Sequence, residues 1–133
     1  MNGRLSSIQQ QDTVTIQFLD AFAAAWCRHD TDAILAAMTS DCVFQQSVGT
    51  TVDGIRATGQ SAVRLAIDSV FATFPDALWN DASHFIAGDR GVSEWTFTAT
   101  GPVGRIEVLG CDLFTFRDGL IAVKNSFRKS RSI

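Results

Sequence analysis

The sequence predicts an α+β fold: three N-terminal helices packed on a strongly curved antiparallel sheet, together forming a cone-shaped α+β barrel. Before Pro75, apolar residues recur at helical spacing, and after it they alternate with polar ones. Turn signals then recur at regular intervals: Gly88-Asp89, Gly101-Pro102 and Asp118-Gly119. Long strands coil, and a coiled sheet capped by helices leaves a hollow. The pattern therefore predicts a pocket as well as a fold class.

The elements are expected in the order helix, helix, strand, helix and four strands. Asp12 or Thr13 can cap the first helix, Asp30 or Thr31 can cap the second, and Pro75 ends the third. Short turns make the last four strands a meander. We expect helices over 13–28, 31–38 and 59–74, a strand over 41–46, and further strands over 77–87, 90–100, 103–116 and 119–128.

The chain has 133 residues, which fits one domain. We interpret residues 1–12 as a flexible N-terminal lead-in and 13–133 as a single α+β barrel domain. The polar lead-in lacks the apolar core of a signal peptide, and no run is long enough to cross a bilayer. Cys27, Cys42 and Cys111 are too widely spaced for a zinc site and are typical of a reducing compartment. A cytoplasmic location is expected.

Charge argues against a nucleic-acid or membrane partner. The net charge is −3 and the isoelectric point is about 5.1. We interpret the basic C-terminal tail as a solvated end. Its cations are Lys124, Arg128, Lys129 and Arg131. The sequence also lacks a phosphate-binding glycine loop, a nucleophile elbow and metal-ligand spacing, so no cofactor and no metal are expected.

Several segments together resemble the nuclear transport factor 2-like superfamily. They are Asp30-Thr-Asp-Ala-Ile-Leu, the strand from Asp41 to Gln46, Gly59-x-x-Ala-Val and Gly110-Cys-Asp-Leu-Phe-Thr-Phe-Arg-Asp-Gly-Leu-Ile. The resemblance covers about residues 14–128 and is nearest to the SnoaL-like polyketide cyclase and ketosteroid isomerase branch. It implies the cystatin-like form of the α+β barrel. It does not imply one reaction, because this fold hosts several enzyme classes and binding modules.

Three positions test the ketosteroid isomerase mechanism, which uses an Asp base and an oxyanion hole of Tyr and a protonated Asp. The resemblance places the Tyr at Phe22, the base at Gln46 and the protonated Asp at Asp112. Phe22 has no hydroxyl group, and the Gln46 amide cannot accept a proton near neutral pH. The sequence therefore argues against that mechanism and leaves Asp112 as the one matching group.

Asp112 is the first catalytic candidate. It lies on a strand face that is otherwise apolar, two residues before Phe114. Loss of hydration there disfavours the charged carboxylate, so we expect a raised pKa for Asp112. A general acid, or a base near neutrality, requires that property. The alternative is a carboxyl group with a purely structural hydrogen bond.

His84 is the second catalytic candidate. If Gly88-Asp89 turns the hairpin, His84 lies opposite Ser93 and shares its face with Trp95. An imidazole there could shuttle protons with Asp112. The alternative is a histidine with structural hydrogen bonds.

The predicted ligand pocket is largely aromatic. Asn125 faces the side of Asp112 only if Asp118-Gly119 forms a two-residue turn, whereas a bulged turn puts Lys124 there instead. That choice stays open. The predicted lining residues are Phe22, Trp26, Gln46, Asn80, Trp95, Phe97, Phe114 and Asn125.

The outer face of the sheet should also be apolar, since it carries Leu109, Cys111 and Leu113. A second copy of the sheet would cover it, so a homodimer is expected. Two functions remain for the pocket. One is cofactor-independent acid–base catalysis on a small apolar carbonyl or hydroxyl compound: isomerisation, cyclisation, dehydration or hydration. The other is ligand binding without turnover. In a third reading, the pocket is vestigial in an interaction domain.

Overall fold

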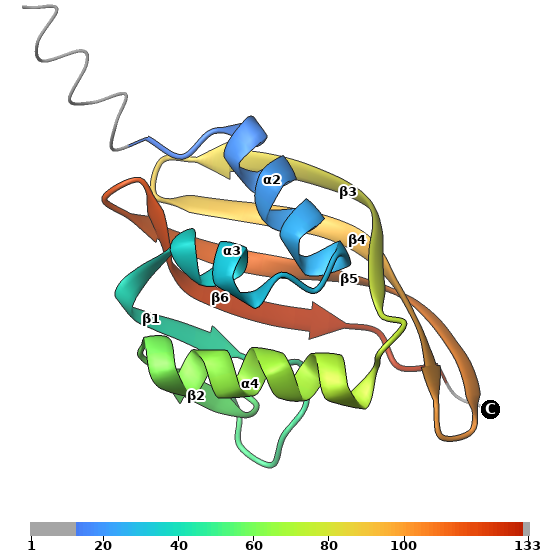
Figure 1. Cartoon of the computed structure of the whole chain (residues 1–133). Helices are drawn as coiled ribbons and strands as arrows, with labels where there is room; N and C mark the ends of the chain where they lie inside the picture. The colour runs from blue at the N-terminus through green and yellow to red at the C-terminus, as the bar shows by residue number, and fades with distance from the viewer. Residues whose placement is uncertain (1–12, 132–133) are drawn as a thin grey trace, which may run out of the picture.

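The computed structural model describes residues 13–131 and confirms the α+β class. Three helices lie on one face of a curved six-stranded sheet (Figure 1). The helices are α2 (Ile16–Cys27), α3 (Thr31–Ala36) and α4 (Gln60–Thr73). The strands are β1 (Met38–Gln45), β2 (Arg56–Thr58), β3 (Leu78–Ala87), β4 (Arg90–Gly101), β5 (Gly104–Arg117) and β6 (Leu120–Arg128).

The sheet has the strand order β2-β1-β6-β5-β4-β3. Its neighbours are antiparallel except β1 and β6, which pair in parallel, so the sheet is mixed where the sequence predicted a wholly antiparallel one. The parallel pair arises because α4 and the meander carry the chain back to the side of β1 (Figure 1). Strand β2 was not predicted, because three residues are too few to show alternation.

Local chemistry explains where the helices begin. Thr15 caps α2, since its Oγ1 accepts a hydrogen bond from Phe18 N at 3.1 Å. Asp30, one of the two predicted caps, caps α3 by accepting a hydrogen bond from Ala33 N at 3.1 Å. For the first helix, Thr13 is not the cap, and Asp12 lies outside the described residues. Helix α4 ends at Thr73, just before the predicted boundary at Pro75.

The core lies between the helices and the inner face of the sheet. Helix α2 packs mainly on β3, and α4 packs on β1 and β2. Trp26 lies at the centre, with the Trp79, Phe71 and Phe44 rings at 5.1, 5.5 and 5.8 Å between centroids. Edge-to-face contacts of this kind stabilise aromatic clusters beyond simple burial. Aromatic side chains therefore form much of the core between the helices and the sheet.

Two irregularities decide which side chains face this interior. In β3 the register shifts between Asn80 and Ser83, where Asp81 has a φ of 56°. In β6 the register shifts opposite Thr115 and Phe116, which leaves Ala122 as an extra residue. A β-bulge of this kind reverses the face of every residue beyond it.

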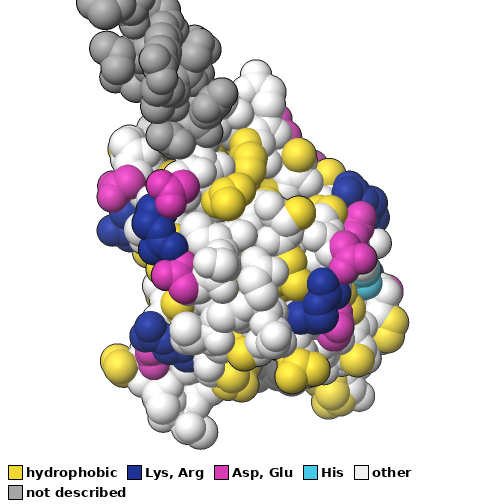
Figure 2. All heavy atoms as spheres, turned by 60° about the vertical axis from the view of Figure 1, so that its left-hand side comes forward, with side chains coloured by type: hydrophobic (Ala, Val, Ile, Leu, Met, Phe, Trp, Pro, Cys, Tyr) yellow, Lys and Arg dark blue, Asp and Glu magenta, His cyan; other side chains and the backbone are white. Residues whose placement is uncertain are grey.

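The face of the molecule in Figure 2 carries charges of both signs side by side. On the face in Figure 2, Lys and Arg side chains lie beside Asp and Glu side chains, with hydrophobic groups between them. Arg64 pairs with Asp32 at 2.8 Å, and Arg117 pairs with Asp41. Within residues 13–131, no helix combines the length and the hydropathy needed to cross a membrane.

Candidate functional site

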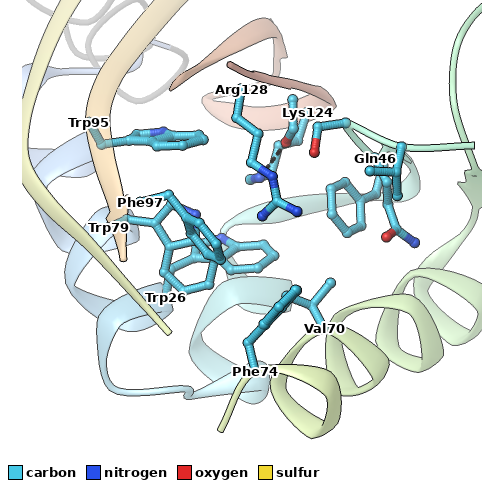
Figure 3. Close-up of a pocket in the computed structure, with 13 residues that line it drawn as sticks. Trp26, Gln46, Val70, Phe74, Trp79, Trp95, Phe97, Lys124 and Arg128 are labelled. Atoms are coloured by element: carbon cyan, nitrogen blue, oxygen red, sulfur yellow. Dashed lines mark hydrogen bonds between the residues drawn. The ribbon is translucent and has the colours of Figure 1, made fainter. Parts of the chain in front are cut away.

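A hollow lies between the helices and the inner face of the sheet, and Figure 3 shows the side chains around it. Its volume is about 80 Å³. A single water needs roughly 10–15 Å³, so the hollow has room for a small organic molecule. The aromatic lining residues are Trp26, Phe44, Phe74, Trp79, Trp95 and Phe97. The others are Gln46, Ser47, Val48, Val70, Lys124, Ser126 and Arg128.

Lys124 brings an ammonium group to the wall of this hollow (Figure 3). The extra residue in β6 turns Lys124 inward, opposite Phe114, and leaves its side chain 5% exposed. Its Nζ lies 4.2 Å from the ring centroid of Trp26 and 4.7 Å from that of Phe44. A desolvated cation is stabilised by aromatic faces, but it also needs an opposite charge.

Asp112 supplies that charge from behind Lys124. One of its oxygens accepts hydrogen bonds from Lys124 Nζ at 2.9 Å and from Ser126 Oγ at 2.6 Å. The other oxygen accepts from Trp95 Nε1 at 3.0 Å. Three donors suit an ionised carboxylate, which can only accept. Asp112 lines a separate narrow space of about 10 Å³ instead of the larger hollow.

Arg128 is the second cation on the wall. Its guanidinium carbon lies 4.4 Å from the ring centroid of Phe97 and 5.5 Å from that of Phe74. Burial lowers the pKa of this guanidinium, which is half-buried. Within residues 13–131, no carboxylate lies within ion-pair distance of Arg128. Its charge is therefore balanced only by aromatic faces and solvent.

Trp26 adds an unused donor. The residue is 4% exposed and lines the hollow, yet its indole Nε1 makes no hydrogen bond within the described part of the chain. A buried donor without a partner costs roughly 1–3 kcal/mol. A buried donor without a partner calls for an explanation, and an acceptor on a bound ligand is one.

His84 lies at the edge of the interior, apart from the hollow. Its Nδ1 is 2.7 Å from Ser93 Oγ, and its Nε2 is 2.9 Å from Asp20 Oδ1. The imidazole is 2% exposed, so both ring nitrogens are satisfied inside the protein. This set of contacts attaches α2 to strands β3 and β4. Ser93 is also the register partner of Asp112, but no hydrogen bond joins His84 to that carboxylate.

The predicted lining residues divide into three groups. Four line the hollow: Trp26, Gln46, Trp95 and Phe97. Phe22 and Phe114 are buried deeper, around the narrow space beside Asp112. Asn80 and Asn125 lie elsewhere, and both placements correct the prediction.

The two bulges explain these corrections. Asn80 pairs with Thr96 and donates to Thr98 Oγ1 at 3.0 Å, because the bulge at Asp81 leaves Trp79 as the inward residue. Asn125 pairs with Leu113 on the outer face, where it lines a loop groove with Asp53. The two-residue turn at Asp118-Gly119 does form. The later bulge nevertheless reverses the faces of the residues beyond it, so Lys124 and not Asn125 points inward.

Sequence reasoning missed Trp79, Phe74 and Arg128 as lining residues. Arg128 was interpreted with Lys124 as part of a solvated tail, whereas both reach the hollow from β6. A weak signal existed for Trp79, since the Asn-Asp pair at 80–81 favours the left-handed conformation that Asp81 adopts. No comparable signal marks the bulge at Ala122.

Metal and thiol chemistry receive no support from side-chain placement. Within residues 13–131, no group of three His, Cys, Asp or Glu side chains lies close enough together to hold a metal ion. The three cysteines are free thiols. Burial raises the pKa of both Cys42 and Cys111, which lowers their reactivity.

The comparisons with known proteins agree with this architecture. The family model of the SnoaL-like domain matches residues 19–124. No curated protein has a significantly similar sequence. Among solved structures, a Xanthomonas campestris protein of unknown function with a cystatin-like fold has a TM-score of 0.77 and 17% identity, over 89% of this chain and 92% of its own.

Two other similar structures hold small molecules. TerC, co-crystallised with polyporic acid, has a TM-score of 0.73 and 20% identity, over 86% of this chain and 90% of its own. A hypothetical protein with a ketosteroid isomerase-like fold from Catenulispora acidiphila, in complex with trimethylamine, has a TM-score of 0.71 and 18% identity, over 86% of each chain. At these identities the likeness shows the fold alone.

Proposed function

This chain belongs to the SnoaL-like family, and on that premise we propose that its hollow binds a small, largely apolar carbonyl or hydroxyl compound. We further propose that the Lys124–Asp112 pair performs cofactor-independent acid–base chemistry on it: isomerisation, cyclisation, dehydration or hydration. The observation that carries the proposal is the buried ion pair on the wall of the hollow. Buried charges cost stability unless they are well paired, so ionisable groups in a hollow often mark a functional site.

The geometry supports a division of labour within the pair. Only Lys124 reaches the hollow, so its ammonium can donate to a ligand oxygen and stabilise the charge that develops there. Asp112 holds the ammonium in place from behind, together with Ser126. Transfer of one proton from Nζ to the carboxylate over 2.9 Å leaves a neutral amine facing the ligand as a base. Asp112 then acts through Lys124.

His84 fits a supporting role in this proposal. Its imidazole is hydrogen-bonded to Ser93, and Ser93 lines the narrow space next to Asp112. This arrangement could pass a proton between the exposed Asp20 and the interior. It does not place the imidazole against a ligand in the larger hollow.

One observation favours ligand binding without turnover. The hollow is lined by cations, amides, hydroxyls and aromatic rings, and its described lining includes no carboxylate and no imidazole. A catalyst that removes a proton from carbon therefore depends on Lys124 alone. If that amine stays protonated throughout, the hollow is a binding site only.

Exchange of α-protons separates the two functions without knowledge of the natural substrate. Small aryl ketones and 1,3-diketones are incubated with the protein in deuterated water, and loss of the α-proton signal is followed by NMR. We expect exchange above the buffer rate, with most of it lost in Lys124→Met and in Asp112→Asn. Lys129→Gln, an exposed neighbour, is the matched control.

Binding is measured in the same samples by saturation-transfer NMR. Ketones that bind without exchange would establish the binding function instead of catalysis. Exchange that persists in Lys124→Met would assign the chemistry to another group. Circular dichroism on each variant verifies the fold.

A further inference from the structure

The hollow is rich in hydrogen-bond donors and carries excess positive charge. Its charged groups are the ammonium of Lys124 and the guanidinium of Arg128, against the single carboxylate of Asp112 behind them. That carboxylate is already engaged by three donors. The net charge at the hollow is therefore positive, although the whole chain has a net charge of −3.

Arg128 is the cation of the hollow that has no counter-charge among residues 13–131. Its guanidinium lies against the Phe97 and Phe74 rings and has no ion-pair partner among residues 13–131. These contacts are with aromatic rings and not with a carboxylate, so the N–H groups of the guanidinium remain able to donate to a ligand. Figure 3 shows this side chain reaching into the space between Trp95, Phe97 and Lys124.

A second, independent observation comes from α2. Trp26 lines the same hollow, and its Nε1 is a buried donor without an acceptor among the described residues. Lys124 differs, because two of its three donors already meet Asp112 and Ser126. Two donor side chains thus have no acceptor in the described part of the chain. They come from different elements, Trp26 from α2 and Arg128 from β6.

We infer that the ligand is a small aromatic carboxylate, whose carboxylate group binds Arg128 and whose ring lies among the aromatic side chains of the hollow. A guanidinium matches a carboxylate through two parallel hydrogen bonds, which makes Arg128 the anchor. The remaining donor, Trp26 Nε1, is free for a second acceptor on the ligand. The surrounding rings, including Trp79 and Trp95, exclude water and favour a flat apolar skeleton.

This inference rests on the proposed function only in requiring that the hollow takes a small molecule. It does not require catalysis. It also cannot be taken from the fold, because the similar structures named above hold an acid in one case and an amine in the other. The sign of the preferred ligand charge is set by Arg128 and Lys124 of this chain.

The test compares three ligands of one shape and different charge: benzoate, benzamide and benzylamine. Binding is measured by calorimetry and by tryptophan fluorescence, up to millimolar concentrations. We expect the affinity to decrease in the order benzoate, benzamide, benzylamine. In Arg128→Gln the affinity for benzoate should fall about tenfold or more, as expected for loss of a charged hydrogen bond. The benzoate affinity of Arg128→Lys should lie between those of the unsubstituted protein and Arg128→Gln.

Controls separate this result from a change in fold or in overall charge. Lys129→Gln removes an exposed neighbouring charge and should leave all three affinities unchanged. Benzamide binding should survive in Arg128→Gln, which shows that the hollow is intact.

Three outcomes overturn the inference. They are equal binding of benzoate and benzamide, an unchanged benzoate affinity in Arg128→Gln, and no binding of benzoate at all. The proposed catalysis fails separately, if ligands bind and no α-proton exchanges. If the protein prefers a neutral ketone and exchanges its α-protons, the proposed catalysis stands and only the inference of a carboxylate ligand is overturned.

Discussion

The ammonium of Lys124 donates to the carboxylate of Asp112 across 2.9 Å, and their side chains are only 5% and 8% exposed. The pair joins β5, which carries Asp112, to β6, whose Lys124 lines the hollow. Removal of one partner leaves the other charge buried and unpaired, so each residue depends on the other for its place in the interior.

The first prediction concerns the stability of this pair. Asp112→Asn and Lys124→Met should each lower the free energy of unfolding by about 3–5 kcal/mol. The double variant should recover a large part of the loss, because no unpaired charge remains. Urea denaturation followed by fluorescence measures all three. Additive losses in the double variant would mean that the two charges are not coupled.

The second prediction concerns the attachment of α2 to the sheet through His84. His84→Ala removes the contacts with Ser93 and Asp20 and leaves the buried Ser93 hydroxyl without this partner. We expect a loss of roughly 1–3 kcal/mol in the free energy of unfolding. Hydrogen exchange should increase first in α2. Asp20→Asn, at the exposed end, should cost less, and an equal cost would contradict this assignment.

The third prediction concerns Gly110, which lies directly beneath Trp95. A Cβ at Gly110 would lie 2.4 Å from the Trp95 ring and 2.6 Å from the backbone oxygen of Phe127, so Gly110→Ala forces the indole, and with it the backbone of β6, to move. The hydrogen bond from Trp95 Nε1 to Asp112 should be lost, with a change in the tryptophan emission spectrum. Trp95→Phe removes the same donor without this clash and serves as the matched variant. An unchanged spectrum in Gly110→Ala would contradict the close approach.

The fourth prediction is acid sensitivity at Asp76. Hydrogen bonds from the Thr100 hydroxyl and N–H hold the pKa of the Asp76 carboxyl below its usual value of 3.8. Because the folded state binds this proton less readily, the stabilisation is present above about pH 4 and is lost as pH falls through the lowered pKa. Asp76→Asn should flatten the pH dependence of unfolding below about pH 4. An identical acid profile in the variant would contradict this origin.

The fifth prediction is the homodimer, which we propose on the outer face of the sheet. Leu109 and Phe127 are 58% and 48% exposed there, and a groove beside them includes Cys111. Apolar groups gathered on one sheet face favour a second copy as cover. Light scattering coupled to gel filtration should give twice the chain mass, and Leu109→Glu should give the monomer. If the unsubstituted protein is a monomer, the proposed homodimer is wrong.

Some site residues could be placed from sequence because strand alternation is local. Asp112 and Phe114 share the inner face, as their spacing of two residues requires. The resemblance to the superfamily placed Trp95 and Phe97 on the pocket side, and both line the hollow. Strand alternation failed for Asn80 and Asn125, since each lies where a register shift intervenes, and a shift of one residue reverses the face.

The sequence by itself determined the fold class and the order of the predicted elements, and it limited the cap of α3 to Asp30 or Thr31. Periodicity and capping act over a few neighbouring residues, which is why they can be read locally. Tertiary structure decided that Lys124 and Arg128 belong to the interior instead of a solvated tail. The physical reason is the bulge at Ala122, which turns Lys124 toward Asp112 and thereby makes a buried cation tolerable.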